Sequence, residues 1–381
     1  MKNLKYSVGI DISKNDFKAC FSVIDDGQKV TVKSSATFVN SLKGFSEFSI
    51  WYDKHHKDDL PLFFLLEATG VYYEHLAWFL YKKDEKVSVI LANKAKRYLQ
   101  SLGMKSKNDK IDAKGLAQMC SEKCLPLWNP ISKSIYELRS LTRLHEDLQN
   151  QRTMVNNQLH AISHSMYSLK QAQRSLQKLY ITLENELVNI EKDILNLIEK
   201  DEKLKLKYAN IKTIKGVGLM TFAVLVAETN GFELVNNKSQ LVSYAGYDVV
   251  ENQSGLRFGK TRISKKGNAH IRRILHMPSF CVVRYEPSFK SFFDRIHERT
   301  HFKMKAYVAV QKKLLTLIYS LWKKDQSYVQ DYIGNYSTAQ AIGPISVDSE
   351  GIQKKPDSKE LASQDEHSIA RAMSPLSVCQ I

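Results

Sequence analysis

Four acidic residues in the N-terminal part of the chain have the types and spacing of a metal-binding set. Asp11 ends a short apolar alternation, and Glu67 directly follows the apolar run Phe63–Leu66. Asp109 and Asp112 are three residues apart at the start of a predicted helix, so both carboxylates should point to one side of it. Carboxylate oxygens suit Mg²⁺ or Mn²⁺. Two such ions could clamp the attacking and leaving oxygens of a phosphodiester.

Each of these acids also has a structural interpretation. Asp11 could polarise a turn, and Asp109 could favour a helix N-terminus through the helix dipole. Glu67 is harder to explain in this way, because a carboxylate at the end of a buried strand is costly to desolvate without a cation or hydrogen-bond donors. The four acids can meet only if a sheet brings the two strand ends together.

The elements that must position these acids are predicted to form an α/β domain over residues 1–128. Period-two alternation and short apolar runs predict strands at 6–12, 17–23, 29–38, 62–66 and 87–91. Helices are expected directly after Asn40, which should cap the first of them, and at about 72–83. This order of elements predicts a mixed sheet flanked by helices.

The remainder of the chain is predicted to be mainly helical. Residues 129–205 carry apolar residues at intervals of three and four, and there is no proline or glycine from 131 to 215. This pattern predicts a helical coiled-coil segment that packs against its own returning arm or a second subunit. A mainly α-helical domain is expected at 206–336. The tail at 337–381 is expected to be disordered, because it loses the aromatic and periodic apolar residues.

The charge of the chain predicts an anionic partner. Lys and Arg exceed Asp and Glu by 16, and nucleic acid is favoured over a membrane because no amphipathic anchor stands out. No apolar run approaches the roughly 20 residues of a membrane span, and the N-terminus lacks the apolar core of a signal peptide. Five scattered cysteines suggest no disulfide framework. We therefore expect a soluble cytoplasmic protein.

Basic residues gather in three segments. From 252 to 273 there are seven Lys or Arg and no acid, with three glycines that allow close approach to a phosphate. The stretch 94–107, which includes Lys96, could hold a nucleic-acid strand or be ordinary surface. Residues 214–218 could be a helix-hairpin-helix turn or a simple glycine turn. The candidate nucleic-acid-binding residues are Lys94, Arg97, Lys105, Lys107, Lys215, Arg257, Lys260, Arg262, Lys265, Lys266, Arg272 and Arg273.

The acidic residues lie in three motifs that occur in order: Gly9–Lys14, Glu67–Gly70 and Asn108–Ala113. Together these motifs resemble the DEDD transposases of bacterial insertion sequences, which include bridge-RNA-guided serine recombinases and the Piv/MooV invertase group. The resemblance implies a RuvC-like, ribonuclease H-type fold for the first domain. It also implies that its catalytic, metal-binding residues are Asp11, Glu67, Asp109 and Asp112.

The second domain contributes a further candidate. Tyr244–Asp248, Gln253–Gly255 and Arg262–Gly267 resemble the transposase domain of the same family, which implies that Ser254 is the catalytic nucleophile. By its type alone, a serine beside a glycine is usually a turn residue. The alternative serines are Ser239, Ser243 and Ser264. A serine ester retains the energy of a phosphodiester, so strands could be exchanged and rejoined without ATP.

The resemblance implies a transposase that depends on Mg²⁺ or Mn²⁺ and exchanges DNA strands through a phosphoserine intermediate. Its implied partners are double-stranded DNA at the element ends and target, a structured guide RNA, and further copies of itself in a dimer or tetramer. It would work in the bacterial cytoplasm, associated with the nucleoid when bound to DNA, and not at a membrane. Two alternatives stay open. One is a RuvC-like junction nuclease without a covalent intermediate, and the other is a non-catalytic nucleic-acid-binding protein.

Overall fold

The computed structural model describes residues 2–103, 108–167, 169–255, 257–259 and 261–330. The predicted tail at 337–381 and three candidate nucleic-acid-binding residues lie outside this part of the chain. These three are Lys105, Lys107 and Lys260.

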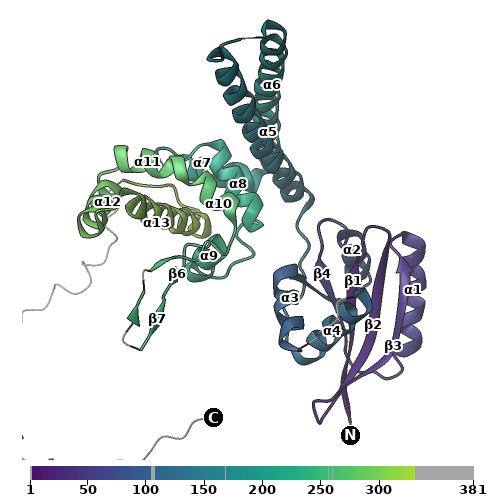
Figure 1. Cartoon of the computed structure of the whole chain (residues 1–381). Coiled ribbons are helices and arrows are strands. Elements are labelled where there is room, and N and C mark those ends of the chain that lie inside the picture. Colours follow the sequence, from purple (N-terminus) through teal and green to yellow (C-terminus); the bar gives the residue numbers. More distant parts are fainter. Residues whose placement is uncertain (1, 104–107, 168, 256, 260, 331–381) are drawn as a thin grey trace, which may run out of the picture. The chain divides into compact units, whose positions relative to one another are not determined.

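The strands β1 to β5 form one mixed sheet in the order β3-β2-β1-β4-β5 (Figure 1). They are β1 (Asn3–Ile12), β2 (Asp16–Asp25), β3 (Val30–Val39), β4 (Leu62–Ala68) and β5 (Lys86–Leu91). The first three are antiparallel, whereas β4 runs parallel to both β1 and β5. Gly9 is in register with Leu65, and Ile10 with Leu66. The mixed α/β sheet predicted from the sequence is confirmed.

Helices cover both faces of this sheet, because alternate strand residues are apolar on each side. On one face, Val8 and Ile10 are buried in a cluster with residues of α1 (Leu42–His55) and α2 (Glu74–Lys82). On the other face, α3 (Ala92–Ser101) and α4 (Asp109–Glu122) pack against the sheet through a smaller cluster that includes Leu65 and Ile90. We refer to residues 3–122 as the sheet region.

The cap of α1 differs from the prediction. The N-cap is Ser41, whose hydroxyl accepts a hydrogen bond from the Gly44 backbone N–H at 3.3 Å. The Asn40 side chain is engaged elsewhere, because its amide donates to the carbonyl oxygens of Ser13 and Tyr72 at 3.0 and 3.2 Å. Asn40 therefore ties the loop before α1 to two other turns instead of capping the helix.

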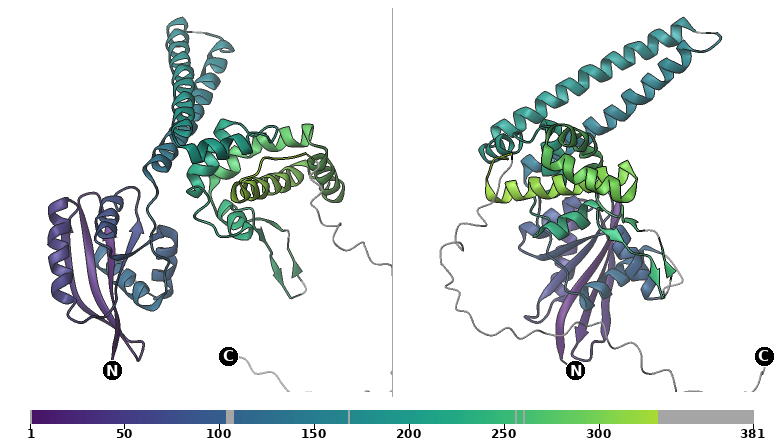
Figure 2. Two further views of the ribbon diagram at one scale, coloured as in Figure 1. Left: turned by 180° about the vertical axis from the view of Figure 1, so that it is seen from behind. Right: turned by 90° about the vertical axis from the view of Figure 1, so that its left-hand side faces the viewer.

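Two long helices follow the sheet region, α5 (Lys133–Ser163) and α6 (Lys170–Lys200), and they run side by side (Figure 2). The buried residues of α6 are spaced by three or four, as the sequence pattern predicts: Leu183, Leu187, Ile190, Ile194 and Ile198. The helical hairpin is therefore present. Supercoiling and pairing with a second subunit stay predictions.

The helices after α6 form a second hydrophobic core together with buried residues of α5 and α6. We refer to residues 202–324 as the helical region. Its helices are α7 (Glu202–Ile211), α8 (Leu219–Thr229), α9 (Lys238–Ala245), α10 (Ala269–Ile274), α11 (His276–Tyr285), α12 (Pro287–Thr300) and α13 (Lys303–Lys324). Phe222, Phe232 and Trp322 are among the buried residues of this core. The mainly helical character is confirmed, but the exact domain boundaries stay a prediction. In the described part of the chain, no helix has the length and apolarity needed to cross a bilayer.

Four short strands interrupt the helical region between α9 and α10. They pair as two small hairpins, β6 (Val249–Val250) with β9 (Arg262–Ile263) and β7 (Gln253–Ser254) with β8 (Arg257–Phe258). This arm carries the basic segment and the candidate serine.

Candidate functional site

The four acidic candidates line one cleft of the sheet region. Asp11 and Glu67 come from the ends of the neighbouring parallel strands β1 and β4, and Asp109 and Asp112 come from the first turn of α4. Asp109 is exposed and the other three are half-buried. Thr69 and one side of α3 complete the lining. The four acids therefore border the same cleft, whereas their role as metal ligands stays a prediction.

Gly9 allows α4 to lie directly on β1. A Cβ atom at this position would lie 2.0 Å from the backbone nitrogen of Ala117 and 2.4 Å from the carbonyl oxygen of Ala113. Real Cβ contacts are almost never below 3.0 Å, so only glycine permits this approach. Because Asp11 follows two residues after Gly9 and Asp112 precedes Ala113, the close packing brings the two carboxylates to one edge.

The first turn of α4 is fixed by a local cap. The Asn108 side chain accepts a hydrogen bond from the Ile111 backbone N–H at 2.8 Å. Asp109 and Asp112 follow within that turn, where the helix dipole favours negative charge. The cap and the dipole therefore stabilise two acidic side chains side by side at the cleft.

Two lysines lie near the carboxylates. The Lys18 ammonium, from β2, forms an ion pair with Asp109. The hydrogen bond to Asp109 raises the pKa of Lys18 despite partial desolvation, and the charges of Asp16 and Asp11 act in the same direction. Of the described residues that line the cleft, Lys96 alone is basic. The cleft therefore carries an excess of negative charge.

The donor set of this cleft fits a hard divalent cation, because it consists of carboxylate oxygens from three different elements. Within the described residues, no three His, Cys, Asp or Glu side chains are already close enough together to hold an ion. The chemistry of the donors thus agrees with Mg²⁺ or Mn²⁺.

Ser254 lies on an exposed hairpin in the helical region. It is in register with Arg257, and Gly255 begins the connection between the two strands with a φ of +56°. This left-handed conformation favours glycine. Ser254 and Arg257 are both exposed, so a phosphate could reach the serine hydroxyl beside a guanidinium.

The alternative serines have different surroundings. The Ser264 hydroxyl donates a hydrogen bond to the Asp248 carboxylate at 2.6 Å, and the residue is half-buried. Ser239 and Ser243 lie on α9 and are exposed. Ser264 therefore helps to hold the base of the arm, whereas Ser254 is at the outer hairpin.

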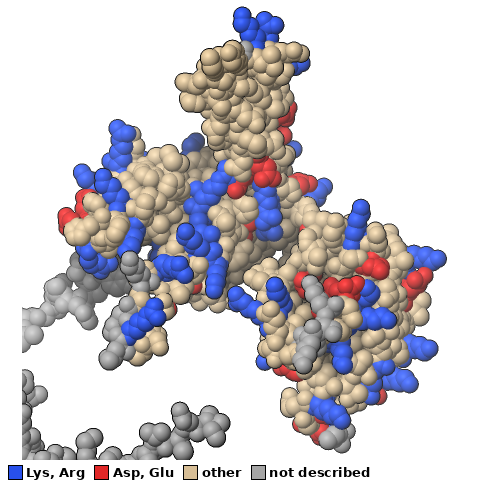
Figure 3. Space-filling model, in the orientation of Figure 1, with Lys and Arg blue, Asp and Glu red and all other residues tan. Residues whose placement is uncertain are grey.

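The basic candidates fall into two groups. Exposed side chains belong to Lys94, Arg97, Lys215, Arg257, Arg262, Lys265 and Lys266. Arg272 instead donates to the carbonyl oxygens of Ala245, Gly267 and Asn268, and Arg273 pairs with Glu146. Arg272 and Arg273 thus have clear intramolecular partners. Figure 3 shows Lys and Arg side chains spread over this face, including a group on the β7 hairpin at the lower left.

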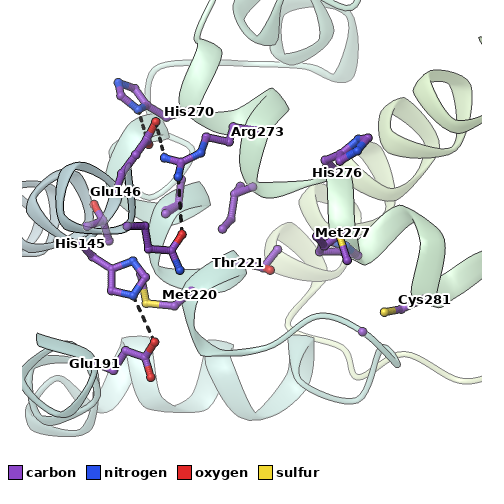
Figure 4. Close-up of a pocket in the computed structure, with 16 residues that line it drawn as sticks. His145, Glu146, Glu191, Met220, Thr221, His270, Arg273, His276, Met277 and Cys281 are labelled. Atoms are coloured by element: carbon purple, nitrogen blue, oxygen red, sulfur yellow. Dashed lines mark hydrogen bonds and ion pairs between the residues drawn. The ribbon is translucent and has the colours of Figure 1, made fainter. Parts of the chain in front are cut away.

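A pocket between α5, α6 and the helical region has no counterpart among the predictions from the sequence (Figure 4). The Glu146 carboxylate on α5 lies between two residues of α10, Arg273 and His270, whose ring Nδ1 is 2.7 Å from Glu146 Oε2. Nearby, His145 Nε2 lies 3.1 Å from Glu191 Oε1 on α6. These pairs join α5 to α6 and α10. No local pattern indicates them, since the partners are far apart in sequence.

A buried acid fixes the end of the basic segment. Glu228 is 2% exposed, and Arg143 binds it through two hydrogen bonds of 2.9 and 3.1 Å. Asn268, the N-cap of α10, donates to the same carboxylate at 2.6 Å. Burial acts to raise the pKa of Glu228, but the bonds from Arg143 and Asn268 outweigh it, and the pKa is lowered. Glu228 is therefore a charged, buried side chain that holds Arg143 of α5 and the N-cap of α10 together.

Two family comparisons match this chain. Residues 8–167 match a family described as a transposase, of the DEDD type found in the IS110 element. Residues 208–294 match the transposases of the IS116/IS110/IS902 family. The first match contains the four carboxylates, and the second contains Ser254 and the whole basic segment 252–273.

The chain is also similar to two relatives and overlaps weakly with a solved structure. The pilin gene-inverting protein of Moraxella lacunata is 29% identical over 327 residues, covering 85% of this chain and 98% of that protein. An uncharacterized 43.6 kDa protein of the insertion element IS110 from Streptomyces coelicolor is 20% identical over 118 residues, 31% of this chain and 29% of that protein. Thermus thermophilus RuvC overlaps with a TM-score of 0.24 at 10% identity, over 30% of this chain and 91% of that one.

Proposed function

The chain belongs to the IS116/IS110/IS902 family of transposases, and on this basis we propose that it moves its own insertion sequence by metal-dependent cleavage and exchange of DNA strands. The observation that carries the proposal is the meeting of Asp11, Glu67, Asp109 and Asp112 in one cleft. Such a set of acids around one cleft is expensive to assemble unless a cation neutralises it.

The four carboxylates would hold Mg²⁺ or Mn²⁺. When bound, the metal would supply positive charge that stabilises the phosphate as it reacts. The residues of this chain set the conditions for that step. Gly9 keeps α4 against β1, and the cap of α4 holds Asp109 and Asp112 at the mouth of the cleft.

Ser254 would be the nucleophile. Its oxygen forms a bond to phosphorus, the bond from phosphorus to one DNA strand breaks, and the serine proton ends on the oxygen of the released strand. The number of phosphoester bonds is unchanged, so the reverse reaction with a different strand end rejoins DNA without ATP. Exposure of Ser254 on its hairpin supports this role, because the hydroxyl is accessible to a DNA backbone.

Ser254 and the carboxylates come from separate regions of the chain. The proposed chemistry therefore requires them to meet at one phosphate, either within one chain or between chains of a dimer or tetramer. The exposed basic residues of the arm would bind nucleic-acid backbones, namely Arg257, Arg262, Lys265 and Lys266. We propose that these backbones include a structured guide RNA as well as DNA, in line with the net charge of +16.

Covalent trapping tests the proposal. The full chain, purified with any bound RNA, is incubated with Mg²⁺ and double-stranded DNA that carries the element ends, and is then run on a denaturing gel. We expect a protein–DNA adduct that Ser254→Ala abolishes while DNA binding persists, and that the matched control Ser239→Ala retains. Asp11→Asn should abolish cleavage. Sequencing of the co-purified RNA tests the guide.

Other outcomes would favour the alternatives. An adduct that survives Ser254→Ala but not Ser264→Ala would transfer the nucleophile to Ser264. Cleavage without any adduct would indicate a nuclease that uses water. Binding with no Mg²⁺-dependent cleavage, unaffected by Asp11→Asn, would indicate a non-catalytic protein.

A further inference from the structure

One side of α3 forms a wall of the carboxylate cleft. The residues that line the cleft from this helix follow a helical spacing and are Ala92, Asn93, Lys96, Leu99 and Gln100. Residues three or four apart lie on one helix face, so a continuous strip of α3 borders the cleft beside the acidic edge. Three of these five side chains can donate hydrogen bonds.

The rotation of α3 about its axis is fixed by its opposite side. Ala95 is buried in the cluster that contains Leu116 and Met119 of α4. Tyr98 packs against the same cluster, and its hydroxyl donates to Glu122 of α4 at 2.7 Å. Because these contacts fix one side of α3 against α4, the side that contains Lys96 borders the cleft. Lys94 and Arg97 are exposed and are not among the described residues that line it.

Lys96 differs from Lys18 in its partners. The Lys18 ammonium is already paired with Asp109, whereas Lys96 has no acidic partner among the described residues. A phosphodiester in this cleft would meet four carboxylates, whose negative charge repels it wherever a cation does not intervene. The phosphodiester would therefore need hydrogen-bond donors on the side of the cleft away from the acids. The Lys96 ammonium and the amides of Asn93 and Gln100 provide them.

We propose that Lys96, supported by Asn93 and Gln100, binds the phosphodiester backbone of the DNA strand that is cut, with the phosphate held between α3 and the carboxylates. This inference rests on the proposed function and deepens it by naming the residues that hold the substrate. It also separates Lys96 from Lys94 and Arg97, which are close in sequence but lie outside the cleft.

The test compares Lys96→Gln with a matched variant of another exposed lysine, Lys43→Gln on α1, which does not line the cleft, and with the conservative Lys96→Arg. Single-turnover cleavage of DNA carrying the element ends is measured with the full chain and its bound RNA in Mg²⁺. We expect Lys96→Gln to slow cleavage by about 10- to 100-fold, the effect of losing one charge-assisted hydrogen bond. Lys96→Arg should recover most of the rate, and Lys43→Gln should stay within about threefold of the wild type.

A second measurement uses Mn²⁺ alone, without DNA. Removing a positive charge from an acidic cleft should tighten Mn²⁺ binding, so Lys96→Gln should bind Mn²⁺ about two- to tenfold more tightly than the wild type. Lys43→Gln should show less than half of that change. Opposite effects on metal affinity and on cleavage distinguish substrate binding from damage to the cleft, which would weaken both.

The failures of the two proposals are distinguishable. If Lys96→Gln cleaves as fast as the wild type while Asp11→Asn does not cleave, Lys96 does not bind the cut strand but the carboxylate chemistry stands. Unchanged Mn²⁺ affinity in Lys96→Gln would show that Lys96 does not face the carboxylates. A wild-type protein that neither cleaves DNA nor forms an adduct would overturn the proposed function and this inference together.

Discussion

Gly9→Ala should damage the candidate site by separating α4, which carries Asp109 and Asp112, from β1, which carries Asp11. The added Cβ would lie 2.0 Å from Ala117 N and 2.4 Å from Ala113 O, whereas ordinary van der Waals contacts begin at 3.4 Å. Both contacts are to backbone atoms, so no side-chain rotation can relieve them. Helix α4 must therefore move away from β1 by about 1.4 Å, and Asp109 and Asp112 move with it.

The cost of this movement can be estimated. Overpacking a core costs about 1–3 kcal/mol, and we expect the upper end because the clash joins a central strand to a helix backbone. A displacement of about 1 Å in a catalytic group can cost about 100-fold in rate. We therefore expect Gly9→Ala to lose about 3 kcal/mol in the free energy of unfolding and about 100-fold in Mg²⁺-dependent cleavage.

Urea unfolding and the cleavage assay measure the two effects. The matched control is Gly218→Ala, because a Cβ there meets no heavy atom within 4 Å and φ is −96°. Its free energy of unfolding should fall by no more than about 1 kcal/mol, because Gly218 is the N-cap of α8 and alanine is a poorer cap than glycine. Adding Ala117→Gly to Gly9→Ala should not restore stability, since the clash involves the backbone nitrogen of Ala117.

Equal stability and equal cleavage of Gly9→Ala and Gly218→Ala would refute this reasoning. Helix α4 would then not lie against β1, and Asp109 and Asp112 would have no fixed relation to Asp11. Rescue by Ala117→Gly would instead show that side chains, and not the backbones, determine the approach of the helix.

Two further predictions concern buried ionisable groups. Glu228→Gln should lower the free energy of unfolding at pH 7 by about 2–4 kcal/mol, because Arg143 loses its carboxylate partner but is itself half exposed. Since the pKa of Glu228 is lowered, the advantage of the wild type should be full above pH 4.5 and should shrink as the pH falls through the lowered pKa, as acid titration of stability would reveal. Burial raises the pKa of the Cys120 thiol to about 11, whereas Cys124 is exposed. At pH 8 a maleimide should therefore label Cys124 in the folded protein and Cys120 only after unfolding, and tryptic cleavage at Lys123 separates the two for mass spectrometry.

Much of the sheet region could be predicted from the sequence. Strand alternation and short apolar runs located β1 to β5 within a few residues, and the three acidic motifs lie where strands β1 and β4 end and α4 begins. The long apolar repeat without proline or glycine located the α5–α6 hairpin. These features are local, because the period of the apolar residues and the capping side chain are both encoded within one segment.

Other elements were missed or misassigned for identifiable reasons. Helix α3 was interpreted only as a basic stretch, because it is short and Ala95 is its single buried residue. The cap of α1 was assigned to Asn40 instead of Ser41, since both residue types cap helices well. The basic segment gave no sign that Arg272 would donate to carbonyl groups or that the exposed Arg273 would pair with Glu146.

The amino-acid sequence by itself determined which residue types carry the proposed chemistry, where the strands and long helices run, and that the chain carries a large positive charge. Only the tertiary structure decided that β1 and β4 are neighbours in register, that α4 approaches β1 at Gly9, and that Lys96 faces the acids while Lys94 does not. The physical reason is that periodicity is a property of neighbouring residues. Register, close approach and the direction of a helix face depend instead on packing between segments that are far apart in sequence.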